Sequence, residues 1–194
     1  MRKFLTIFAA FAIMSLSASA QTLGINYSPF GVASMAFSDG VYHYTSSLGG
    51  GVTYEFLTNG DSIMLEGNYS VFSFDKFNPS GEQIDLPNTE NMKVATLMAY
   101  YGWTINKRKR IQFPIYAGLG VNSFDSSPGP EVILCAGLKA RAKFYISNRF
   151  GIFTGVNASY GIILPNVNSE QSFVGSYRPI SAEIGLMFDL LDNK

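Results

Sequence analysis

The feature that most constrains this chain is a two-residue alternation of apolar and polar side chains, which recurs in eight segments. Segment 180–190 shows it most clearly. The even positions there are apolar: Ile180, Ala182, Ile184, Leu186, Phe188 and Leu190. Successive side chains of a β-strand point to opposite faces, so this period predicts a strand with one apolar and one polar face. The segment is also as long as a tilted strand that crosses a bilayer, about 9–11 residues.

The eight segments are separated by connections that alternate in length. We expect strands near 23–37, 41–57, 62–74, 92–105, 111–124, 132–146, 151–164 and 180–190. The connections 58–61, 106–110 and 147–150 are short, 75–91 and 165–176 are long, and 125–131 is intermediate. Bacterial outer-membrane barrels pair short periplasmic turns with longer outer loops. The pattern predicts an all-β fold, an eight-stranded antiparallel up-and-down transmembrane β-barrel.

The N-terminus is typical of a secretory signal peptide over residues 1–20. Arg2 and Lys3 precede the short apolar run 4–14, and Ala18-Ser19-Ala20 forms an A-x-A cleavage site. We therefore expect cleavage after Ala20, export from the cytoplasm, and one barrel domain over residues 21–194.

Charge and cysteine content exclude several classes of function. The full chain has 14 basic and 14 acidic residues, and loss of the leader leaves a slight acidic excess, so nucleic acid is not an expected partner. One cysteine and one histidine cannot form an internal disulfide or a usual zinc cluster. We expect no metal and no cofactor. Cys135 is interpreted as a small filler residue on a polar face, with a redox role as the alternative.

The placement of aromatic residues favours an apolar face that points outward to lipid. The apolar faces are nearly free of charge, and many aromatics fall near the short-turn ends of their segments: Tyr54, Phe56, Tyr101, Trp103, Phe113, Phe144 and Phe188. Tyr42, Tyr44 and Tyr160 fall toward the opposite end. Two aromatic belts around an aliphatic band match the two interfaces of a bilayer. The alternative is a soluble, lipocalin-like periplasmic carrier with its apolar face inside.

An outward apolar face places a set of charged residues in the lumen: Glu55, Glu66, Lys139, Arg141, Lys143, Glu183 and Asp189. Eight strands enclose a space that side chains can fill, and unpaired buried charges are costly. We therefore expect an ion-paired plug with a structural role. A narrow channel for small solutes, with the cations setting anion preference, remains the alternative.

Local features of three segments suggest irregular backbone. Pro29 is expected to bend the first strand, and Pro114 is expected to require a bulge because proline donates no ladder hydrogen bond. Residues 49–51 are three glycines, which predicts a close approach or a kink in the wall.

The single histidine, His43, raises the possibility of a lipid A-modifying enzyme. Ser46, Ser47 and Asp39 lie close to it in sequence, and a Ser–His–acid arrangement requires the histidine to polarise a hydroxyl. No motif around His43 supports that chemistry. We interpret it as a polar rim residue, expect no catalytic residues, and expect no enzymatic activity.

From Leu23 to Leu190 the chain resembles the outer-membrane β-barrel domain proteins of Bacteroidota-type bacteria, and it is similar in plan to small OmpX-like, OmpA-like and porin-like barrels. The resemblance implies residence in the outer membrane of a Gram-negative cell envelope and contact with outer-membrane lipid. It also implies recognition by the barrel-assembly machinery, although Phe188 is not the terminal residue. The resemblance favours a structural or partner-binding role, and the long connections 75–91 and 165–176 are the expected contact regions for an envelope protein partner.

Overall fold

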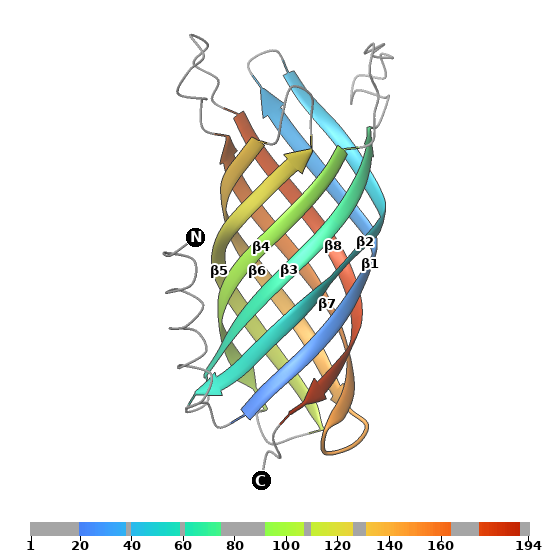
Figure 1. Cartoon of the computed structure of the whole chain (residues 1–194), viewed down its shortest axis with the longest axis vertical. Helices are drawn as coiled ribbons and strands as arrows, with labels where there is room; N and C mark the ends of the chain where they lie inside the picture. The colour runs from blue at the N-terminus through green and yellow to red at the C-terminus, as the bar shows by residue number, and fades with distance from the viewer. Residues whose placement is uncertain are drawn as a thin grey trace, which may run out of the picture.

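The computed structural model describes residues 20–37, 40–58, 61–74, 92–106, 110–125, 131–163 and 175–190, and these residues form eight long strands. Figure 1 shows the strands arranged in a ring, each tilted against the long axis of the barrel. Their bounds are β1 Ala20–Phe37, β2 Gly40–Thr58, β3 Asp61–Phe74, β4 Met92–Ile105, β5 Ile111–Asp125, β6 Glu131–Tyr145, β7 Phe150–Ile163 and β8 Gly175–Asp189. None of the described residues forms a helix long and apolar enough to cross a membrane.

Each strand pairs in antiparallel fashion with its neighbours in sequence, and β1 pairs with β8 to close the barrel. At the closing seam the Leu190 amide donates to the Gln21 carbonyl at 2.8 Å. Closure leaves no strand edge unpaired. The predicted eight-stranded up-and-down barrel is confirmed. The β1–β2, β3–β4, β5–β6 and β7–β8 connections lie at one end (Figure 1), which is called the loop end below, and the opposite end is called the turn end.

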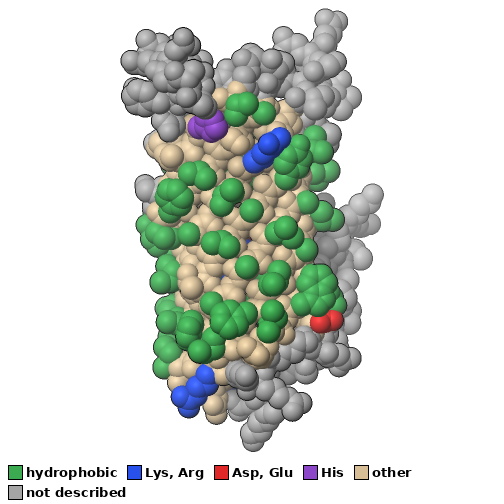
Figure 2. Space-filling view, turned by 180° about the vertical axis from the view of Figure 1, so that it is seen from behind, with side chains coloured by type: hydrophobic (Ala, Val, Ile, Leu, Met, Phe, Trp, Pro, Cys, Tyr) green, Lys and Arg blue, Asp and Glu red, His purple; other side chains and the backbone are tan. Residues whose placement is uncertain are grey.

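The wall separates two kinds of side chain. On β4, Leu97 is 60% exposed on the outside, whereas its neighbour Met98 is buried inside. The same alternation holds around the ring, and large apolar side chains cover the outer wall between its two ends (Figure 2). The outer surface is therefore suited to lipid, as the sequence predicted.

Two register shifts interrupt the regular ladder. The β1–β8 pairing shifts between Tyr27 and Phe30, where Pro29 was expected to bend the strand. The β2–β3 pairing shifts between Thr45 and Leu48. Because one extra residue reverses which face a side chain occupies, Tyr44 packs against the interior and not against lipid. Its assignment to an outer aromatic belt was wrong.

The expected bulge at Pro114 is also absent. The β5–β6 register is the same on both sides of the proline, from Gln112 opposite Lys143 to Ile115 opposite Ala140. Pro114 pairs with Thr104 across the β4–β5 ladder and is buried inside. The missing N–H of Pro114 therefore removes a hydrogen bond locally without shifting the pairing of β5 with β6.

The interior near the loop end is apolar, which the predicted charged lumen did not include. A buried cluster fills it, with Tyr44 and Met92 packed alongside: Ala33, Met35, Phe72, Val94, Phe124, Ile133 and Tyr177. Phe124 and Tyr177 meet edge to face, with ring centroids 4.9 Å apart. The lumen is thus divided into an apolar part near the loop end and a charged part deeper in the barrel.

Turn-end connections are tight where they are described. Asn106 adopts φ 63°, a left-handed conformation that asparagine tolerates better than most residues. In the β6–β7 turn, the Phe150 amide donates to Ser147 Oγ at 3.0 Å. Several predicted segments lie outside the described residues: 1–19 of the signal segment 1–20, the Asn59-Gly60 turn, the connection 75–91, residues 126–130 of the connection 125–131, and most of 165–176.

Candidate functional site

Three cations project into the barrel from one strand. Lys139, Arg141 and Lys143 occupy alternate positions on β6, so they share its inner face while Leu138 lies on the outer face. The acids that meet them come from other strands, Glu55 on β2, Glu66 on β3 and Glu183 on β8. None of these six charged residues is more than 4% exposed.

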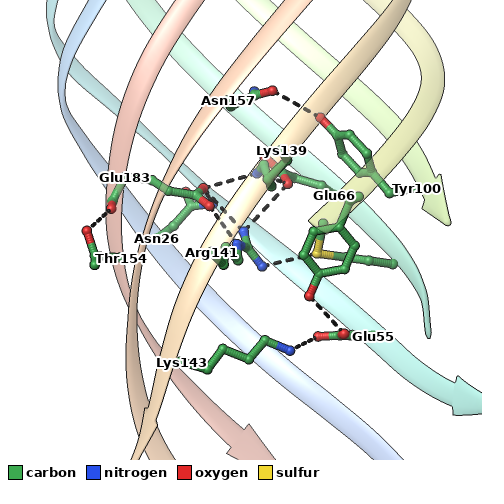
Figure 3. A network of polar contacts seen from close by, with 12 residues as sticks. Asn26, Glu55, Glu66, Tyr100, Lys139, Arg141, Lys143, Thr154, Asn157 and Glu183 are labelled. Carbon is green, nitrogen blue, oxygen red and sulfur yellow. Dashed lines mark hydrogen bonds and ion pairs between the residues drawn. The ribbon is translucent and has the colours of Figure 1, made fainter. Parts of the chain in front are cut away.

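Lys139 and Arg141 share two carboxylates in the middle of the barrel (Figure 3). The Lys139 ammonium contacts Glu66 and lies 3.1 Å from Glu183 Oε2. Arg141 binds Glu183 in bidentate fashion, with Nε 2.6 Å from Oε1 and Nη2 3.2 Å from Oε2. Its Nη2 also lies 3.6 Å from Glu66. The four charges therefore form one connected network, which is the geometry that stabilises buried ions best.

Lys143 and Glu55 form a second pair closer to the turn end (Figure 3). The Tyr116 hydroxyl donates to the other Glu55 oxygen at 2.9 Å. Both carboxylate oxygens of Glu55 are thus occupied. The pair joins β6 to β2, which lie on opposite sides of the strand ring.

Aromatic and amide side chains complete the surroundings of the ions. Arg141 lies over the Phe153 ring at 4.2 Å, and Lys139 lies 5.5 Å from the centre of the Tyr100 ring. Asn26 donates to Glu183 at 3.3 Å. Ring faces attract cations, so these contacts replace part of the lost hydration.

Three cations and three carboxylates give the network no net charge. Near the turn end, Thr22 also donates to the buried Asp189 at 2.6 Å, so the seventh residue of the predicted lumen set is hydrogen-bonded as well. Groups held in this way are suited to tying strands together and to filling the lumen. They do not present a free acid or base to a substrate.

Sulfur atoms line the space between the network and the apolar cluster. Cys135 is buried, and its thiol donates to Met98 Sδ at 3.3 Å. Met98 and Cys135 belong to a small core with Met64, Tyr100 and Tyr116. Among the described residues, no group of three or more His, Cys, Asp or Glu side chains is placed to hold a metal ion.

The aromatic residues singled out in the sequence lie on the outer wall near the turn end. Trp103 is 51% exposed and meets Tyr101 edge to face at 5.0 Å. The Tyr101 hydroxyl donates to Asp61 at 2.5 Å. Phe113, Phe144 and Phe188 are exposed, and Tyr54 is partly exposed. Phe56 differs, because it is only 2% exposed beside the Tyr54 ring.

His43 and the nearby serines do not converge. His43 pairs with Ser34 and follows the outward face of β2, whereas Ser46 is buried and its hydroxyl donates to the Leu48 carbonyl at 3.1 Å. The side chain of Ser47 and all of Asp39 lie outside the described part of the chain. The described residues therefore do not assemble a hydroxyl and an acid around the histidine.

Comparison with known proteins identifies the fold. No family model and no curated protein sequence matches the chain. Among solved structures, Neisserial surface protein A superimposes with a TM-score of 0.54 at 13% identity, covering 87% of this chain and 96% of that protein. Outer membrane protein AlkL, solved in lipid bilayers, gives 0.56 at 10% identity, covering 91% and 92%.

At these identities the likeness concerns the fold, which is that of small outer-membrane barrels. The resemblance to this structural class is confirmed. The narrower resemblance to barrels of Bacteroidota type stays a prediction.

Proposed function

We propose that this chain is an integral outer-membrane protein whose closed barrel is a rigid, non-enzymatic support for its loop-end connections. The outer wall carries the observation that supports this most strongly. Exposed aliphatic and aromatic side chains surround the barrel, while the charged residues of its middle point inward (Figures 2 and 3). A soluble carrier would need the opposite arrangement.

The support role follows from the closed lumen and the positions of the connections. The ion-paired network and the apolar cluster both fill the interior, so the barrel offers no described cleft with an unpaired acid, base or nucleophile. The connections 75–91 and 165–176 follow rigid strands at the loop end, where binding residues are commonly carried. We propose that they contact an envelope protein or another ligand.

Biogenesis belongs to the same proposal. Export with cleavage after Ala20 would leave nearly all of β1, which begins at that residue, and the barrel-assembly machinery would insert the chain. The cleavage site can be tested on protein purified from membranes. N-terminal sequencing of the membrane-bound form should begin at Gln21.

The first experiment compares the gel mobility of membrane-extracted protein in SDS before and after boiling. A closed barrel resists SDS until it is heated, so we expect a clear mobility difference and recovery in the outer-membrane fraction. Identical mobility, with the protein in the soluble periplasm, would overturn the proposal. It would also favour the lipocalin-like carrier.

A narrow channel is the second candidate function, because charged side chains line the lumen. Conduction requires water to pass between Lys139, Arg141 and their carboxylate partners, which contact each other directly. We therefore expect silent planar bilayers at moderate voltage. Discrete conductance steps that change in Arg141→Ala would establish the channel instead.

A further inference from the structure

The outer wall carries a polar row at the loop end that the proposed function does not use. Ser34 on β1 pairs with His43 on β2 and with Arg178 on β8, so the three residues occupy one line across adjacent strands. Their sequence neighbours Ala33 and Tyr177 are buried in the interior cluster. The row itself therefore faces outward.

Arg178 is held against the wall by an aromatic partner. Its guanidinium lies 5.3 Å from the centre of the Tyr160 ring, and Tyr160 is itself exposed on β7. A guanidinium stacked on a ring keeps its N–H groups free at the edge of the plane, where they can bind an oxyanion. The contact orients the cation on this face of the barrel.

The surroundings favour an anion that is attached to a lipid. One step toward the turn end, Val32 pairs with Ile180, so the apolar wall begins directly beside the row. Figure 2 shows a histidine and a basic side chain at the loop end of one face, above apolar side chains. On the described parts of β1, β2, β7 and β8 the acidic side chains are Glu55, Glu183 and Asp189, and all three are buried inside.

We propose that Arg178, seated on Tyr160, binds a phosphate group of an outer-leaflet glycolipid of the lipid A type, and that Ser34 and His43 extend the contact with its headgroup along the row. The inference rests on the proposed function, because it requires the loop end to lie in the outer leaflet. The backbones of His43 and Arg178, at the two ends of the row, are about 10 Å apart, since two strand spacings separate them. The Arg178 guanidinium leans toward Tyr160 on β7, so Ser34 and His43 continue the row on the other side of the Arg178 backbone.

The chemistry of the row matches the phosphorylated sugar headgroup of such a lipid. Arginine binds phosphate with two parallel N–H donors, and the hydroxyl and imidazole farther along the row supply donors for the rest of the headgroup. The acyl chains would lie along the apolar surface beside Val32 and Ile180. The phosphate would thus contact the polar row, and the acyl chains would contact the apolar wall directly beside it.

Native mass spectrometry of the folded barrel in detergent tests this site. Diphosphoryl lipid A is titrated against the same lipid without phosphates, and the fraction of lipid-bound barrel gives the affinity. We expect the wild-type chain to prefer the phosphorylated lipid. Arg178→Gln should bind it at least about tenfold more weakly, because a charge-assisted hydrogen bond contributes that much. His43→Gln should lower the affinity less.

Lys93→Gln is the matched control. Lys93 is also exposed on the outer wall at the loop end, but it lies on β4, away from the row. Its loss should leave lipid A binding unchanged. Three outcomes would each overturn the proposal. The wild-type chain could bind phosphorylated and phosphate-free lipid A equally, or Arg178→Gln and Lys93→Gln could lose the same affinity. The wild-type chain could also bind phosphatidylglycerol as tightly as diphosphoryl lipid A.

The mobility shift in SDS separates failure of this site from failure of the proposed function. Each variant should keep the heat-dependent shift of the wild-type barrel, because the row lies outside the core. A wild-type chain that shifts but shows no phosphate preference removes only the lipid site. A wild-type chain without the shift removes the membrane barrel on which the site depends.

Discussion

Lys143 on β6 and Glu55 on β2 form a buried ion pair that spans the barrel between opposite strands. Ladder hydrogen bonds connect each strand only to its two neighbours, so they cannot join these two strands. The ion pair does so through side chains, and the Tyr116 hydroxyl on β5 occupies the second Glu55 oxygen. Cross-barrel contacts of this kind resist flattening of the ring as well as filling it.

Removing one partner of this pair should destabilise the barrel strongly. In Glu55→Gln the Lys143 ammonium stays buried without its carboxylate, and breaking such a pair costs about 3–5 kcal/mol. Urea unfolding of the barrel reconstituted in lipid vesicles measures the change. The temperature at which the mobility shift is lost in SDS should fall in parallel.

The double variant Glu55→Gln, Lys143→Met is the control for that experiment. Replacing both ions with uncharged groups removes the unpaired charge, so most of the lost free energy of unfolding should return. A double variant as unstable as the sum of its single variants would contradict an energetic link between the two residues.

Gly51 and Gly67 offer a matched pair of wall positions on neighbouring strands. A Cβ at Gly51 would lie 1.8 Å from Asn68 Oδ1 and 2.3 Å from the Gly67 carbonyl oxygen, whereas a Cβ at Gly67 would meet nothing within 4 Å. Gly51→Ala should therefore lower the free energy of unfolding by about 1–3 kcal/mol, as overpacking does. Gly67→Ala should leave urea unfolding nearly unchanged, and similar losses in both variants would contradict the close approach.

The alternation of β8 was sufficient to predict a strand with one apolar and one polar face, and the nearly charge-free apolar faces with their aromatic belts predicted which face points outward. The pattern could not predict that Tyr44 turns inward. The bulge between Thr45 and Leu48 depends on how β2 pairs with β3, and Ser46-Ser47 carries no proline or glycine that signals it. One inserted residue then reversed the face of every residue before it in the strand.

The apolar interior near the loop end could not be predicted from the alternation for a related reason. In β6, Val132, Ile133 and Leu134 are all apolar, so the inward residue is hidden between two outward ones. The alternation and the aromatic belts together predicted that the charged residues lie in the lumen. Their partners were not, because Lys139 meets Glu66 and Glu183 only through the register of non-adjacent strands.

The thiol of Cys135 should be protected in the folded barrel. It lies inside the wall against Met98, and bulky reagents cannot reach it from lipid or from water. Maleimide labelling of the unboiled protein in detergent should be slow, and boiling in SDS should make it fast. A cysteine placed at the exposed Asn148 of the β6–β7 turn, in a Cys135→Ala chain, is the reactive control. Equal labelling of Cys135 before and after boiling would contradict its position in the interior.

The fluorescence of Trp103, the only tryptophan, should report the depth of the turn-end aromatic residues in a bilayer. Trp103 is exposed on the outer wall near the end of β4, whereas Leu97 is exposed on the same face nearer its middle. In vesicles that contain brominated lipids, Trp103 should be quenched most by bromines close to the headgroup, because aromatic belts lie at the interface. Leu97→Trp in a Trp103→Phe chain should be quenched most by bromines near the middle of the acyl chains. Identical depth profiles would contradict the belt, and no quenching at either position would show that the apolar wall does not face lipid.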